Sequence, residues 1–166
     1  MLTKEQLIKR LNLEKHPEGG YFKETYRSEM SISESSLPSR FSSQRSVSTC
    51  IYFMLTSDEF SAFHKVNQDE AWHFYLGATI ELHMISPEGE YSKIHIGNDF
   101  FNDETTQFIV PAQHWFAAEI HKEDSFALVG CTVAPGFDFK DFELADRLEL
   151  QREFPEHKII ISKLTR

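Results

Sequence analysis

The chain has 166 residues, of which 40% are hydrophobic and 13% aromatic, and 26 acidic against 17 basic residues give it a formal net charge of −9. This length suffices for a single domain with a full hydrophobic core, and the composition excludes a disordered chain. Because the chain is acidic and has no basic cluster, nucleic acid and anionic membrane surfaces are poor partners.

The amino terminus predicts a short helix over residues 3–11. Thr3 is suited to cap it, Gln6 completes a capping box, and Leu2 can pack against Leu7. No secretory leader and no apolar run of about 20 residues is present. We therefore expect a cytoplasmic protein whose two cysteines, Cys50 and Cys131, are reduced core residues.

Proline and paired glycines predict a turn over residues 16–20, and alternation predicts a strand over residues 21–27. The next segment, residues 28–46, contains nine serines among its nineteen residues and has no apolar periodicity. It is either a mobile lid at the mouth of a barrel or a plain solvated loop.

Residues 47–133 show short strands and tight turns without a helical period, which favours an antiparallel sandwich or barrel. The first of these strands is apolar on both faces, which predicts a central strand or one buried in a subunit contact. The predicted strands are 47–55, 61–66, 70–76, 79–86, 91–96, 107–110, 114–120 and 126–133.

The tail changes character where Ala134-Pro-Gly136 ends the last strand. Three aromatic residues then form a predicted clasp against the sheet: Phe137, Phe139 and Phe142. Residues 141–154 predict a helix that ends before Pro155. Residues 157–164 are compatible with a strand or a short helix, and we favour the helix.

His64 and Glu70 are the predicted catalytic pair. If strands 61–66 and 70–76 are neighbours, both side chains can point to one face and act as base and acid in an aromatic environment. The alternative is a structural hydrogen bond that joins the two strands. His73 falls on the opposite face.

The spacing of these residues resembles the two cupin motifs. The first motif is represented by His64, Glu70 and Gly77, and the second by Gly97 and Pro111-Ala-Gln-His-Trp-Phe116. Val66 and Phe116 stand where cupins usually have metal-binding histidines. We therefore expect no metal and no other cofactor; a degenerate metal site of His64, Glu70 and His114 is the remaining alternative.

Four longer stretches resemble a branch of small bacterial and fungal cupin-like proteins long filed as a domain of unknown function. They are His16-Pro-Glu-Gly-Gly-Tyr-Phe22 with residues 24–28, residues 63–75, residues 110–115 and residues 128–139. The resemblance implies one mainly β domain over residues 1–166, a double-stranded β-helix (cupin jelly-roll barrel) over 20–136. An N-terminal helix within 1–15 and a C-terminal clasp with helices over 137–166 flank it. A homodimer and a ligand pocket inside the barrel are also implied.

The closest functional analogy within the cupins is to metal-free sugar epimerases that use a histidine base. By this analogy His64 abstracts a proton and Glu70 orients it or returns a proton. A sugar or nucleotide-sugar would be the partner, in contact with predicted ligand-binding residues Trp72, Phe74, His114 and Phe116. The main alternative is a small-molecule binding protein without turnover, and a degenerate metal enzyme is the third hypothesis.

Overall fold

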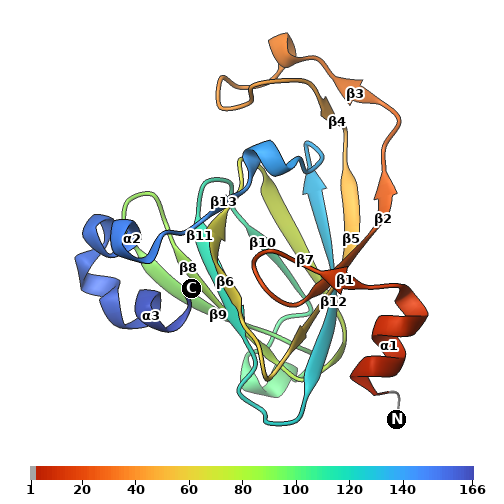
Figure 1. Ribbon diagram of the computed structural model, residues 1–166, viewed down its shortest axis with the longest axis vertical. Helices are drawn as coiled ribbons and strands as arrows, with labels where there is room; N and C mark the ends of the chain where they lie inside the picture. Colours follow the sequence, from red (N-terminus) through yellow and green to blue (C-terminus); the bar gives the residue numbers. More distant parts are fainter. Residues whose placement is uncertain (1–2) are drawn as a thin grey trace.

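The computed structural model describes residues 3–166 and consists of two facing antiparallel sheets with short helices outside them (Figure 1). The first sheet has the strand order β1-β2-β5-β12-β7-β10, and the second has the order β13-β6-β11-β8-β9. The strands are β1 Glu14–Lys15, β2 Tyr21–Arg27, β3 Ser31–Ile32, β4 Arg45–Ser46, β5 Thr49–Thr56, β6 Ser61–Lys65, β7 Asp69–Gly77, β8 Ile80–Ile85, β9 Tyr91–Ile96, β10 Gln107–Val110, β11 Trp115–Glu119, β12 Phe126–Ala134 and β13 Glu143–Leu144.

The main core lies between the two sheets. Phe53 of β5 and Trp72 of β7 belong to the same buried cluster as Leu82 of β8 and Phe116 of β11. Side chains that alternate with these point outward, as the two-residue period of a strand requires. This arrangement is the jelly roll expected from the sequence, and the predicted mainly β fold class is confirmed.

The outer face of the first sheet is covered by helix α1 (Lys4–Leu11). The predicted Thr3–Gln6 capping box is present. Leu7 packs in a second buried cluster with Met54 of β5 and Leu128 of β12. β5 pairs with β2 and β12, so its two apolar faces are those of a central strand. The predicted contact of Leu2 lies outside the described residues.

The serine-rich segment is partly ordered by buried contacts. It contains the β3–β4 pair and a 3₁₀ turn, η1 (Glu34–Ser36), and it projects beyond β2 and β5 in Figure 1. Phe41 and Arg45 are nevertheless buried, and Arg45 forms a bidentate ion pair with Asp141. Neither a free lid nor a fully solvated loop describes this segment.

The C-terminal helices α2 (Arg147–Glu153) and α3 (Lys158–Lys163) lie against the outer face of the second sheet (Figure 1). Helix α3 confirms the predicted short helix. The predicted helix over 141–154 is wrong at its start: Glu143 and Leu144 pair with β6 as β13, and Asp146 caps α2. The remaining 3₁₀ turns are η2 Phe100–Asn102, η3 Phe139–Asp141 and η4 Pro155–His157.

Both cysteines are free, as expected. Across residues 3–166, no helix has the length and apolarity needed to cross a membrane.

Candidate functional site

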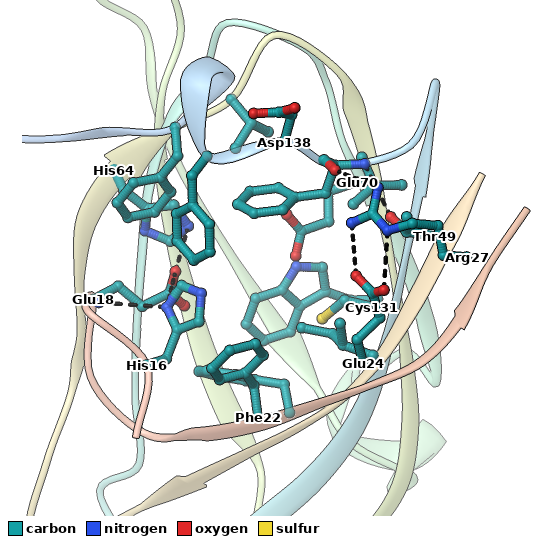
Figure 2. A pocket seen from close by; sticks show the side chains of 18 residues that line it. His16, Glu18, Phe22, Glu24, Arg27, Thr49, His64, Glu70, Cys131 and Asp138 are labelled. Atoms are coloured by element: carbon teal, nitrogen blue, oxygen red, sulfur yellow. Dashed lines mark hydrogen bonds and ion pairs between the residues drawn. The ribbon is translucent and has the colours of Figure 1, made fainter. Parts of the chain in front are cut away.

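A cavity of ≈ 310 Å³ opens between the two sheets, and most of its wall is aromatic or aliphatic (Figure 2). Its polar groups come from the turn before β2, from β2, β5, β6, β7 and β12, and from Asp138. The lining residues that the chemistry below depends on are His16, Glu18, Arg27, His64, Glu70 and Trp72.

The tight turn that precedes β2 places Glu18 in the cavity wall. Gly19 and Gly20 have φ values of +116° and +71°, which favour glycine. The backbone oxygen of Glu18 accepts a hydrogen bond from the Ala62 amide of β6 at 2.8 Å. The turn is thereby fixed beside β6, the strand that carries His64.

Glu18 joins two histidines at one side of the cavity. Its Oε2 lies 3.1 Å from Nε2 of His64 and 3.2 Å from Nδ1 of His16, and its Oε1 accepts a hydrogen bond from the Ser61 hydroxyl at 2.9 Å. All three charged or titratable side chains are buried, with at most 8% of any one exposed. We call His16, Glu18 and His64 the buried network.

The hydrogen bonds of His64 constrain where its proton lies. Nδ1 is 2.8 Å from the Ala62 carbonyl oxygen, which only accepts, so Nδ1 carries a proton. Nε2 therefore shares a further proton with Glu18 or meets it as a bare lone pair, and a 3.1 Å contact between two acceptors is unfavourable. Burial lowers the pKa of His64, and the neighbouring histidines lower the pKa of Glu18 despite its burial, so the two facing atoms share a proton only while the pair as a whole is protonated.

His16 sits in an aromatic cage. Its ring centroid is 4.7 Å from that of Phe22 in an edge contact and 6.1 Å from that of Phe139 in a stacked contact. Burial lowers the pKa of His16, but the hydrogen bond and charge of Glu18 outweigh it and raise that pKa above its usual value. The charge of Glu18 thus favours the imidazolium form inside an apolar wall. Nδ1 of His16 lies 3.2 Å from Glu18 Oε2 and 3.4 Å from the Glu18 backbone nitrogen, and Nε2 has no hydrogen-bond partner among residues 3–166.

Glu70 provides a carboxyl group of a different kind. It is 9% exposed, and no hydrogen bond or ion pair joins it to His64 in the described chain. Burial and the nearby negative charge of Glu18 raise its pKa from 4.5 to about 7. Cys131 lies beside it, and burial together with the Glu70 charge raises the pKa of that thiol well above its usual value.

The ion pair of Arg27 and Glu24 stands at the other side of the cavity in Figure 2. Arg27 donates two hydrogen bonds to Glu24, at 3.0 and 2.7 Å, and a third to the Phe137 carbonyl oxygen at 3.1 Å. These contacts tie β2 to the aromatic clasp. Phe137 and Phe142 pack against the main core, as the sequence predicted.

Only some of the predicted site residues line the cavity. His64, Glu70 and Trp72 line the cavity, and the buried Trp72 Nε1 has no acceptor with full hydrogen-bond geometry. Phe116 packs against His64 in a tilted arrangement, with 4.0 Å between ring centroids, but lies outside the lining. The other two predicted ligand-binding residues, Phe74 and His114, do not line this cavity as residues 3–166 form it.

Two functional candidates were missed by sequence reasoning, which took His16 and Glu18 as part of a turn. The available signal was the occurrence of two titratable residues next to paired glycines. At the two positions where cupin histidines were expected, Val66 lines the cavity and Phe116 covers His64, so neither offers a metal ligand.

Comparisons with known proteins agree with this fold. Residues 5–145 match the family described as "Cupin superfamily (DUF985)". An uncharacterized protein of Saccharomyces cerevisiae is 35% identical over 147 residues, covering 82% of this chain and 72% of the yeast protein. No activity accompanies the description of this yeast relative.

Solved structures extend the comparison. A Shewanella oneidensis protein is 40% identical with a TM-score of 0.90, covering 100% of this chain and 99% of its own. A hypothetical protein from Leishmania major is 31% identical with a TM-score of 0.89, covering 99% of each chain. Oxalate decarboxylase from Bacillus subtilis is similar in fold alone, with 13% identity, a TM-score of 0.55, and coverage of 90% of this chain and 36% of its own. The extent of the family match and these relatives together establish that the chain belongs to the DUF985 family of the cupin superfamily.

Proposed function

We propose that the cavity binds a small polar molecule and catalyses a proton transfer on it without a metal, as in a sugar isomerase or epimerase. The observation that carries the proposal is the buried Glu70 carboxyl, whose pKa of about 7 lies near neutrality and which forms no ion pair with any of residues 3–166. A group with such a pKa can both take up and release a proton at neutral pH.

The buried network supplies the second proton-transfer group. His16 presents a free Nε2 in the cavity wall, and its Nδ1 is oriented by Glu18. His64, the base expected from the sequence, faces Glu18 at 3.1 Å and can exchange a proton with it. We propose that Glu70 and His16 form the acid–base pair. Glu18 and His64 then keep His16 in position through the buried network.

The size and walls of the cavity support a ligand of about monosaccharide size. A volume of ≈ 310 Å³ is at the lower end of the range for small-molecule sites. The aromatic rings around His16 provide apolar faces on which a sugar ring can stack. A nucleotide-linked sugar would place only its sugar inside, with the rest at the mouth near Arg27.

A binding protein without turnover is the second candidate. The observation that favours it is the full hydrogen bonding of His64, whose two nitrogens already contact Ala62 and Glu18. In such a protein the buried network and Glu70 would only orient a ligand.

The test is solvent-deuterium exchange into a panel of aldoses, ketoses and nucleotide-linked sugars, followed by NMR. Exchange at a carbon next to a carbonyl supports the isomerase, and Glu70→Gln should then slow it by about 10²–10⁴-fold. His73→Asn is the matched control, because His73 contacts Gln107 and Thr132 outside the cavity. Stabilisation by a sugar without exchange favours the binding protein, and neither effect from any compound would overturn both candidates.

A further inference from the structure

A second group of titratable side chains lies on the outer face of the β6–β11–β8–β9 region, away from the cavity. Glu81 and His83 of β8 alternate with Leu82, which points into the core. In the strand register Glu81 is opposite Glu119 of β11. His121, two residues after Glu119, extends the same outward row, so these side chains meet on one surface.

Two carboxylate oxygens in this group each face two imidazole nitrogens. Oε1 of Glu81 lies 3.3 Å from Nε2 of His83 and 3.2 Å from Nε2 of His121. Oε1 of Glu119 lies 3.2 Å from Nε2 of His83 and 3.7 Å from Nε2 of His121. The ligand atoms of Glu81, His83 and Glu119 all lie within 4.8 Å of one another.

These distances, from 3.2 to 3.7 Å, are close to the edges of a metal-coordination tetrahedron. Bonds of about 2.0–2.2 Å from zinc to nitrogen or oxygen give edges of about 3.3–3.6 Å between ligands. A charge-assisted N–H···O bond is shorter, at about 2.7–2.9 Å. Each Nε2 has hydrogen-bond geometry to one carboxylate only, His83 to Glu119 and His121 to Glu81, whereas a cation between the four atoms would contact all of them.

His83 has the supporting hydrogen bond that metal-binding histidines usually have. The residue is 2% exposed, and its Nδ1 lies 2.8 Å from the Tyr91 hydroxyl. This contact leaves Nε2 as the atom directed at the carboxylates and fixes the ring. His121 is the opposite case, with 58% of its side chain exposed, so it can adjust to an incoming ion.

Two lysines surround the cluster. Lys93 contacts the other oxygen of Glu81, Oε2, at 3.0 Å and leaves Oε1 free. Lys163 of α3 contacts Oε1 of Glu119 at 2.5 Å and so occupies one of the oxygens facing the histidines. Its exposed side chain can leave, and a divalent cation would take over its role as counter-ion.

We propose that Glu81, His83, Glu119 and His121 form a binding site for a divalent transition metal ion, with Zn²⁺ as the best fit. The two carboxylates balance the charge of the ion, and two neutral imidazoles complete four ligands. The site is separate from the cavity and independent of its proposed function. A bound ion would join β8 to β11 and to His121, which follows β11.

The experiment is a calorimetric titration of the chelator-treated full-length protein with ZnCl₂. One equivalent is expected to bind, and His121→Asn should weaken binding without affecting folding, because His121 is exposed. Tyr91→Phe should lower the affinity by about 10–100-fold, the usual effect of losing such a supporting contact. Lys163→Met should raise the affinity, because it removes the competing cation.

His73→Asn is the control, since this histidine lies on the other sheet and should leave the titration unchanged. Co²⁺ as a substitute ion should give the intense visible absorption of a tetrahedral site in the parent protein and lose it in His121→Asn. The proposal is overturned if no Zn²⁺ binds, or if His83→Gln and His121→Asn both retain the affinity of the parent. In those cases the cluster is an ion-pair network only.

Discussion

The carboxylate of Glu18 lies 3.1 Å from Nε2 of His64, and both side chains are buried. These residues come from different elements, a glycine-rich turn and strand β6. Since the same carboxylate also contacts His16, a single acidic residue neutralises and orients both imidazoles in the cavity wall. When charges are paired and buried in this way, the removal of any one partner strongly lowers the free energy of unfolding.

We expect Glu18→Ala to destabilise the protein by about 3–5 kcal/mol, because it leaves two buried imidazoles without their acceptor. Urea denaturation at pH 7 measures the change. Ser61→Ala removes a single hydrogen bond to the same carboxylate and should lower the free energy of unfolding by about 1 kcal/mol only. Equal effects of the two substitutions would show that Glu18 does not hold the network together.

Arg45 should anchor the serine-rich segment through its ion pair with Asp141. Both side chains are 1% exposed, and Asp141 also accepts hydrogen bonds from Asn67 and Gln68. Arg45→Met leaves the Asp141 carboxylate buried without its cation, so we expect a loss of about 3–5 kcal/mol and faster hydrogen exchange over residues 31–46.

Arg40→Met is the matched control for that experiment. Arg40 belongs to the same segment and is exposed, and among residues 3–166 its side chain donates only to the Asn67 carbonyl oxygen. Its substitution should change the free energy of unfolding by less than about 1 kcal/mol. If exchange over the segment were as slow in Arg45→Met as in the parent, Phe41 and the β3–β4 pair would be sufficient anchors.

Most of the fold is readable from the sequence because the strands obey a local period. Leu82 and Met84 alternate with Glu81 and His83. The structure places the first pair in the core between the sheets and the second pair on the outer face of the second sheet. The start of the C-terminal helix was not readable in the same way. Glu143 and Leu144 have no local signal for β13, which forms only because β6 offers a free edge.

The candidate site was readable only in part, for a physical reason. His64 and Glu70 are close in sequence, which suggested a pair, but the acidic partner of His64 is Glu18, 46 positions before it and in a turn. Such a contact depends on how the turn folds over β6, and periodicity carries no information about that. The tilted ring contact between Phe116 and His64 likewise arises from the pairing of β11 with β6.

Two glycines of neighbouring strands should differ in their tolerance of alanine. A Cβ at Gly77 would lie 2.2 Å from the Phe126 backbone oxygen, and Gly77 has φ +112°. A Cβ at Gly130 would meet the Tyr75 side chain, which is half exposed and can move. We expect Gly77→Ala to cost about 1–3 kcal/mol and Gly130→Ala less, as measured by urea denaturation. The reverse order would contradict the rigid contact at Gly77.

The stability of the protein should decrease as the pH rises through the titration of Glu70. Its pKa is about 7 in the folded state and 4.5 in the unfolded chain, so between these values the folded state binds more protons than the unfolded state. The unfavourable contribution is absent below about pH 4.5, grows up to about pH 7 and is then constant. A pKa difference of this size lowers the free energy of unfolding by up to about 3 kcal/mol.

Glu70→Gln removes the ionisable group and keeps the shape, so its free energy of unfolding should exceed that of the parent more at pH 8 than at pH 5. Urea denaturation of both proteins at the two pH values measures this difference. Glu29→Gln, at an exposed carboxylate, controls for the general effect of removing one negative charge from an acidic chain. If the two substitutions gave the same pH dependence, Glu70 would be ionised without penalty, and its role as the proton donor in the cavity would have to be abandoned.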